Sequence, residues 1–198
     1  MRTAAIYSLY AGTEAFNASG SFIAAMAKKK SRAKAKITST RVQPIPKGYH
    51  TVVPTLTVRN AVQALEFYKN AFGAKEKMRM PGPDGNTIMH AEIMIGDSHI
   101  MLGEENPQMN QLSPQSLNGT ASGLYIYVKN VDKVFDQAVK AGATADMPVT
   151  DMFWGDRFGH VKDPFGHSWG IATRKRNLSA KDMKKAADEW FAQQAKQQ

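Results

Sequence analysis

The sequence contains a weak internal repeat of about 70 residues, which restricts the fold more than any other feature. Val58-Arg59-Asn60 returns as Val128-Lys129-Asn130, and Gly73-Ala74 returns as Gly142-Ala143. Each copy is too small to bury its own hydrophobic face. We therefore expect two copies of one supersecondary unit to pair around a shared core.

Hydrophobic runs and turn signals in the first copy predict the order strand, helix, strand, strand, strand. Residues 51–58 are typical of a strand, and Asn60 can cap a helix over 61–72 that ends at Gly73. Three more strands are predicted at 75–80, 87–95 and 98–103.

The second copy predicts the same order, with a strand at 123–128, a helix at 131–141, and strands near 144–149, 157–162 and 168–173. Ser179 then begins a capping-box-like helix that runs towards Gln197 and carries Trp190 and Phe191. We expect an α+β fold of two tandem βαβββ modules. Their curved mixed sheets would form a pseudo-symmetric cleft, followed by a C-terminal helix.

The positive charge of the chain is concentrated at its N-terminal end. The net charge is +9, yet residues 1–50 hold nine Lys and Arg against one acidic residue, so the remainder is nearly neutral. We predict a disordered basic extension at 1–48, a folded domain at 49–174 and the helical segment at 175–198. We expect the extension to be solvated rather than to bind a specific nucleic acid, although nonspecific contact with RNA or anionic lipid stays open. Met26 is a possible translation start, which would leave residues 1–25 untranslated.

The chain has no cysteine, so thiolate metal sites, disulfides and a cysteine nucleophile are excluded. This composition suits a reducing cytoplasm. No segment approaches the roughly 18 apolar residues of a membrane span, and the interrupted N-terminal region argues against a signal peptide. Dinucleotide, nucleotide-hydrolysis, zincin and serine-hydrolase motifs are also missing.

Alternation along the predicted strands gives each sheet a hydrophobic face and a mildly polar face. In the third strand, Met89, Ala91, Ile93 and Ile95 alternate with Ile88, His90, Glu92 and Met94. In the first strand, Val52, Pro54, Leu56 and Val58 would form the hydrophobic face. The polar faces predict a concave ligand site lined by Thr55, Thr57, His90, Glu92, Tyr125 and Tyr127.

Several stretches resemble the vicinal oxygen chelate superfamily, the group of glyoxalases, bleomycin-resistance proteins and extradiol dioxygenases. They are LTVRNAVQALEFYKNAFGA at 56–74, GDSHIMLGEE at 96–105 and FWGDRFGHVKDPFGHSWGIAT at 153–173. The last two are similar to the PhnB-like branch. The resemblance covers about residues 50–174 and implies a homodimer, in which Trp190 and Phe191 would supply an apolar contact.

The resemblance also implies where metal ligands would stand in metal-dependent members. These positions fall on Val53, His90, Gly123 and Gly170, and only His90 can bind a metal. We therefore expect no metal and no cofactor, and a protein that binds and sequesters a small molecule. The alternative is a metal-dependent lyase, isomerase or dioxygenase with a displaced site around His90, helped by Glu92 and by His160 or Asp156.

Several individual residues have two interpretations. His90 and Glu92 are either an acid–base pair or parts of the pocket wall. Trp154 and Arg157 either clamp a planar or anionic ligand, or form a structural loop in which Asp156 or another carboxylate holds the guanidinium. Asp163-Pro164-Phe165-Gly166 is interpreted as a structural turn, and His160 and His167 as structural or surface residues.

Overall fold

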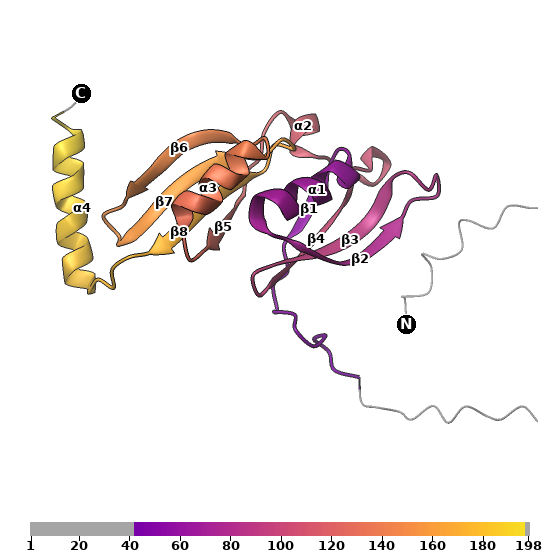
Figure 1. Ribbon diagram of the computed structural model, residues 1–198, viewed down its shortest axis with the longest axis horizontal. Helices are drawn as coiled ribbons and strands as arrows, with labels where there is room; N and C mark the ends of the chain where they lie inside the picture. The colour runs from indigo at the N-terminus through magenta and orange to yellow at the C-terminus, as the bar shows by residue number, and fades with distance from the viewer. Residues whose placement is uncertain (1–41, 197–198) are drawn as a thin grey trace, which may run out of the picture. The chain divides into compact units, whose positions relative to one another are not determined.

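The structure is a computed structural model that describes residues 42–196 (Figure 1). The first module contains β1 (Thr55–Val58), α1 (Ala61–Phe72), β2 (Lys75–Pro81), β3 (Ile88–Ile95) and β4 (Ser98–Glu104). The second contains β5 (Gly123–Tyr127), α3 (Val131–Lys140), β6 (Thr144–Asp151), β7 (Asp156–Lys162) and β8 (Ser168–Arg174). The expected α+β fold with two βαβββ modules is confirmed. Most of the predicted basic extension, residues 1–41, lies outside the described residues.

Each module folds into its own four-stranded mixed sheet. The strand orders are β1-β4-β3-β2 and β5-β8-β7-β6. The first strand of each module pairs in parallel with the last one, and the other pairs are antiparallel. The neighbour of β1 is therefore β4, and β3 lies one strand further away.

The first helix begins and ends at residues suited to those positions. The Asn60 side chain accepts a hydrogen bond from the Gln63 amide, and both Glu104 carboxylate oxygens accept bonds from the Asn60 and Ala61 amides. A carboxylate there satisfies free N–H groups and complements the helix dipole. Gly73 ends the helix at φ 65°, a left-handed conformation that glycine adopts readily.

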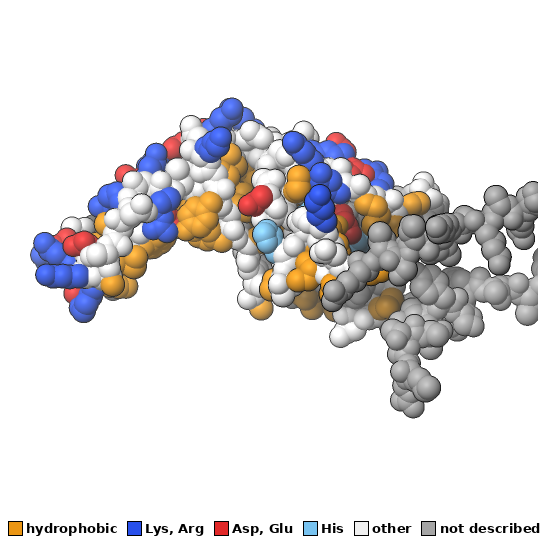
Figure 2. Space-filling view, turned by 90° about the horizontal axis from the view of Figure 1, so that it is seen from below, with side chains coloured by type: hydrophobic (Ala, Val, Ile, Leu, Met, Phe, Trp, Pro, Cys, Tyr) orange, Lys and Arg blue, Asp and Glu red, His pale blue; other side chains and the backbone are white. Residues whose placement is uncertain are grey.

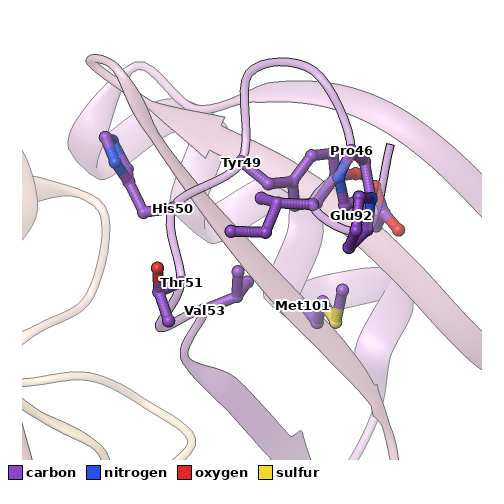
Figure 3. Close-up of a pocket in the computed structure, with 9 residues that line it drawn as sticks. Pro46, Tyr49, His50, Thr51, Val53, Glu92 and Met101 are labelled. Carbon is purple, nitrogen blue, oxygen red and sulfur yellow. The ribbon is translucent and has the colours of Figure 1, made fainter. Parts of the chain in front are cut away.

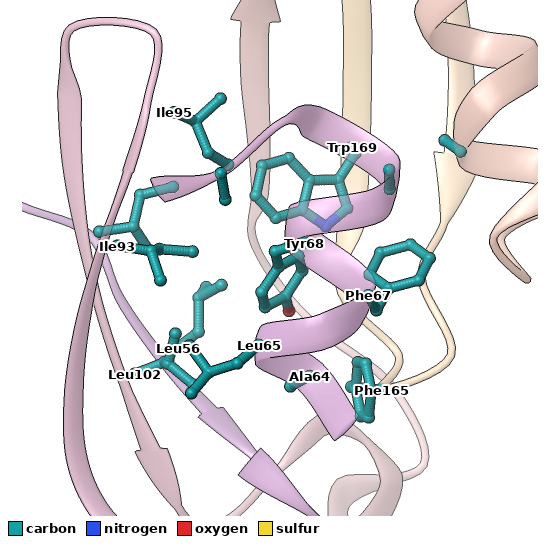
Figure 4. Packing of buried hydrophobic residues seen from close by; sticks show 14 of the residues in the cluster. Leu56, Ala64, Leu65, Phe67, Tyr68, Ile93, Ile95, Leu102, Phe165 and Trp169 are labelled. Atoms are coloured by element: carbon teal, nitrogen blue, oxygen red, sulfur yellow. The ribbon is translucent and has the colours of Figure 1, made fainter. Parts of the chain in front are cut away.

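The hydrophobic core is continuous across the two modules. In Figure 4, α1 lies between sheet residues such as Leu56 and Leu102 on one side and Phe165 and Trp169 on the other. Trp169 belongs to the second module and is fully buried. Helices α1 and α3 also contact each other, and Gln137 of α3 donates a side-chain bond to the Asn70 carbonyl. The modules share one core, as the repeat predicted.

The turn between β7 and β8 joins the modules. One Asp163 carboxylate oxygen accepts bonds from the Phe165 and His167 amides, and the other accepts from Tyr68 and Trp169, both at 2.9 Å. His167 is buried, and its Nε2 lies 3.1 Å from the Thr57 carbonyl oxygen of β1. These contacts give the turn and His167 structural roles.

Two details of the predicted strands are wrong. The first strand begins only at Thr55, and Val52, expected on its hydrophobic face, is 80% exposed. In β3, Met89 is exposed and Ile88 is buried, the reverse of the predicted faces. The pairing of β2 with β3 shifts register between Met80 and Pro81, and such an irregularity moves a side chain to the other face.

The connection between the modules contains a short 3-10 helix (Pro107–Met109) and α2 (Pro114–Leu117). Glu105 organises it by accepting bonds from Arg59, from the Ser113 amide and hydroxyl, and from Ser116. These bonds, led by that from Ser116, lower the Glu105 pKa to about 2.

The last helix, α4 (Ala180–Gln194), begins at the predicted N-cap Ser179. Its Trp190 and Phe191 rings contact Phe153 in the loop between β6 and β7, with ring centres 5.6 and 6.2 Å apart. Phe191 nevertheless stays largely exposed. None of the helices in residues 42–196 combines the length and the apolar character that crossing a membrane requires.

Candidate functional site

A pocket of about 360 Å³ lies over the first sheet (Figure 3). Residues 43–54, which we call the strap, form one side of it, and β3 and β4 form the other. The lining residues are Pro44, Ile45, Pro46, Tyr49, His50, Thr51, Val53, Glu92 and Met101. We refer to it as the strap pocket. Its size is at the lower end of small-molecule sites, and its walls are mainly apolar.

Glu92 is the carboxylate of the strap pocket. Tyr49 donates its phenolic hydrogen to Glu92 Oε2, and His90 Nε2 lies 3.4 Å from Oε1. The hydrogen bond from Tyr49, followed by that from His90, lowers the Glu92 pKa, although desolvation opposes the shift. The same bond raises the Tyr49 pKa. Glu92 is therefore an anion at neutral pH.

The sheet places methionines on both sides of Glu92. The register pairs Glu92 with Met78 of β2 and with Met101 of β4, and Met101 in turn pairs with Thr55. Residues paired across neighbouring strands point to the same face. This row puts one charged group among flexible, polarizable side chains that adapt to varied ligands.

The strap is fixed through Tyr49. Its ring stacks on His99 of β4 with centroids 4.0 Å apart and planes inclined by 22°. In Figure 3, Tyr49 and Pro46 lie beside Glu92, whereas His50 lies at the opposite end of the pocket. Tyr49 therefore forms part of the pocket wall beside Glu92.

A second cluster surrounds Asp156 at the start of β7. One oxygen of this carboxylate accepts bonds from the Tyr125 and Tyr127 hydroxyls and the Trp154 indole at 3.0–3.1 Å. Its other oxygen lies 2.8 Å from Arg174 Nε, an ion pair without hydrogen-bond geometry. The Asp156 side chain is only 1% exposed. Desolvation and the Asp156 charge raise the Tyr125 pKa.

Aromatic rings extend this cluster over the second sheet. Tyr125 stacks on Phe158 at 5.4 Å, and Trp154 contacts both Phe158 and Phe153. Tyr125 and Tyr127 are exposed. Figure 2 shows that hydrophobic side chains, drawn in orange, form patches on the face in view. An aromatic surface beside a buried carboxylate can stack planar molecules.

Arg157 does not join the aromatic cluster. Its guanidinium donates to Asp132 at 2.6–3.2 Å and to Asp151 at 3.3 Å. A second cavity of about 400 Å³ is lined by Arg157, Lys175 and Arg176, together with Asp151, Met152, Gly155 and Asp156. Carboxylates therefore hold the Arg157 guanidinium, as in the interpretation of this segment as a structural loop. The carboxylates are those of Asp132 and Asp151 and not that of Asp156.

The predicted site residues form two groups in the chain. Glu92 lines the strap pocket and His90 lies beside Glu92, while Tyr125, Tyr127 and Trp154 meet at Asp156 on the other sheet. Thr55 and Thr57 lie on β1 and do not line either cavity. Within residues 42–196 no hydrogen bond joins the two groups.

The residues at the family's metal positions do not fit a metal ion. Val53 and Met101 of β4 both line the strap pocket. In the strand order, β4 lies beside β1, and β3, which carries His90, lies on the other side of β4. At Gly170, a Cβ atom would lie 2.8 Å from the rings of both Tyr125 and Phe158, so aromatic rings fill the space of a ligand side chain. In the described part of the chain, no three His, Asp or Glu side chains form a group that could hold a metal.

Tyr49, Met101 and Arg174 are site residues that the sequence analysis missed. Tyr49 was placed at the edge of the folded domain, where no periodic pattern assigns a side chain to a face. The parallel pairing of β1 with β4 brings Met101 beside Val53, and strand alternation alone does not reveal which strands are neighbours.

Comparison with known proteins places this arrangement in a family. Residues 49–171 match the model of the Glyoxalase/Bleomycin resistance protein/Dioxygenase superfamily. An uncharacterized protein of Mycobacterium bovis is 40% identical over 136 residues, which cover 67% of this chain and 89% of that protein. The chain belongs to this superfamily.

Solved structures show the same fold. TioX from Micromonospora sp. ML1 is 26% identical and has a TM-score of 0.51, covering 62% of this chain and 97% of TioX. The PhnB protein from Bacillus cereus, described as a putative 3-demethylubiquinone-9 3-methyltransferase, is 18% identical with a TM-score of 0.50, covering 63% and 99%. The resemblance to the vicinal oxygen chelate fold, with a PhnB-like neighbour, is confirmed.

Proposed function

We propose that this protein binds and sequesters a small organic molecule in the strap pocket without a metal ion. The observation that carries the proposal is a mainly apolar pocket of about 360 Å³ that contains a single carboxylate, Glu92. Three of the four family ligand positions, Val53, Gly123 and Gly170, have no metal-binding side chain. These positions do not supply a set of metal ligands, and the apolar strap pocket supports binding without a metal instead.

An enzyme with a displaced site around His90 is the second candidate. The contact of 3.4 Å between His90 Nε2 and Glu92 Oε1 favours it, because a histidine beside a carboxylate can transfer protons. His160 and Asp156, the other residues considered for this role, lie on the second sheet. His160 Nδ1 lies 3.2 Å from an Asp146 carboxylate oxygen. The Asp156 carboxylate already accepts hydrogen bonds from Tyr125, Tyr127 and Trp154.

A homodimer would give the second aromatic group a role in binding. The strap pocket and the Asp156 group lie on different sheets, and neither described cavity is lined by residues of both, so a second copy would be one way to bring them into a common cleft. The exposed Phe191 and the adjacent Trp190 offer an apolar contact for it. The cysteine-free composition supports a cytoplasmic protein, and the near-neutral folded region supports a small-molecule ligand rather than a specific nucleic acid.

Native mass spectrometry tests the binding function. The protein is measured alone, with zinc, nickel, cobalt, manganese and ferrous iron, and with a library of small organic molecules. We expect ligand adducts on metal-free protein that decrease in Met101→Trp, which fills the pocket. A tightly held metal that His90→Ala removes would favour the enzyme, and an absence of organic adducts would refute sequestration.

A further inference from the structure

Glu92 is a hydrogen-bonded carboxylate of the strap pocket that has no lysine or arginine partner in the described part of the chain. Asp163 and Glu104 also lack such a partner there, but neither lines the pocket, and their oxygens accept bonds from backbone amides or buried side chains. Glu76, Glu105, Asp132 and Asp156 each form an ion pair with a lysine or arginine. Among residues 42–196, the partners of Glu92 are the neutral Tyr49 phenol and the His90 imidazole, which is charged only when protonated. No lysine or arginine of this region pairs with Glu92.

The lack of a lysine or arginine partner matters because Glu92 lies in a partly apolar environment. Its side chain is 14% exposed and lies between Met78 and Met101, on a pocket wall that also includes Ile45 and Val53. An anion in a partly apolar site loses hydration, and a cation brought close restores part of that energy. The imidazoles of His90 and His99 lie near the carboxylate, and an imidazole carries a positive charge only when it is protonated.

We propose that the strap pocket selects ligands that carry a protonated nitrogen group, such as an amine or amidine, on an apolar body. The cation would pair with Glu92 Oε1, the oxygen that Tyr49 does not occupy, and the apolar body would lie against Val53 and Met101. This inference rests on the proposed small-molecule binding and adds the chemical class of the ligand.

A series of nearly isosteric probes tests the charge preference. Benzamidine, benzamide and benzoate are planar and close in size, and at about pH 8 they carry positive, zero and negative charge. Binding is followed by NMR of ¹³C-methyl-labelled methionine, with the Met101 signal assigned through Met101→Leu. We expect benzamidine to bind at least about tenfold more tightly than benzamide, and benzoate most weakly.

Variants locate the preference at Glu92. Glu92→Gln should reduce benzamidine affinity to about that of benzamide while leaving benzamide binding unchanged. Glu66→Gln, which neutralises a carboxylate on α1 outside the pocket, should leave the preference intact. Tyr49→Phe should also retain it, because Oε1 is not bonded to the phenol.

The outcomes separate the two proposals. Equal binding of benzamidine and benzamide, or a preference that survives Glu92→Gln, would overturn the cation preference and leave small-molecule binding intact. If no probe perturbs Met101 at millimolar concentration, the cation preference is also wrong. The library adducts in native mass spectrometry then decide separately whether the pocket binds other molecules.

Discussion

The Tyr68 hydroxyl in α1 donates a 2.9 Å hydrogen bond to the carboxylate of Asp163, which lies 95 residues further along the chain in the other module. Trp169 donates to the same carboxylate oxygen, and all three groups are buried. Burial, followed by the Asp163 charge and the hydrogen bond, raises the Tyr68 pKa well above its usual value. This contact couples the modules within the shared core.

Replacing Tyr68 with Phe should lower the free energy of unfolding by about 1–3 kcal/mol, because Asp163 loses a donor in a buried site. Tyr127→Phe is a matched control: it removes a hydroxyl that donates to Asp156 at 3.0 Å, but from an exposed ring. We expect a loss below about 1 kcal/mol there. Chemical denaturation measures both, and equal losses would contradict a special role for the contact between the modules.

Glu105 should contribute to stability against acid. Its folded pKa of about 2 lies below the unfolded value of about 4.5, so its contribution is complete above pH 4.5 and is lost as the pH falls towards 2. Glu105→Gln should lower Tm at neutral pH, and the difference from the original protein should shrink over that range. Thermal unfolding across pH, with Glu66→Gln as control, measures this. A difference that does not change with pH would show that the lost contacts, not the ionisation, cause the effect.

Gly170 should not tolerate a side chain. A Cβ there would come within 2.8 Å of the Tyr125 and Phe158 rings, so Gly170→Ala should separate their stack and destabilise the fold by about 1–3 kcal/mol. Gly119→Ala is the control because a Cβ atom added at that position would meet nothing within 4 Å. That variant should be neutral or slightly stabilising. Comparable unfolding curves for the two variants would contradict the tight packing at Gly170.

Helix α4 should affect association more than folding, because its Trp190 and Phe191 contact Phe153 while none of the helix residues with a described side chain is fully buried. Replacing Trp190 and Phe191 together with Ala should leave the midpoint of domain unfolding nearly unchanged. It should also shift a dimer towards monomer in light scattering. Lys184→Ala is an exposed control on the same helix. An unchanged mass for the double variant would exclude these rings as the dimer contact.

The repeat and the capping residues were sufficient to predict the modules. Asn60 and Ser179 accept the N-terminal helix bonds expected of them, because capping depends on residues within one turn. Asn130, the counterpart of Asn60 in the repeat, accepts such a bond as well. The errors in β1 and β3 occur where pairing with another strand, and not the local sequence pattern, determines the structure. Val52 precedes the pairing with β4, and the register shift beside Met89 depends on how β2 packs.

The candidate site was only partly predictable for a related reason. Alternation correctly placed His90 and Glu92 on one face of β3, since a strand fixes the side of each residue. It could not reveal that Tyr49 folds onto Glu92, that Met101 lies beside Val53, or that the aromatic group gathers at Asp156.

The sequence by itself determined two βαβββ modules and the ends of their helices. These features depend on residue type and on short-range periodicity. The tertiary structure decided which strands are neighbours, which carboxylates form ion pairs with lysine or arginine, and where the strap lies. Those features depend on packing between residues that are far apart in the chain. A local sequence pattern does not report the energy of such contacts.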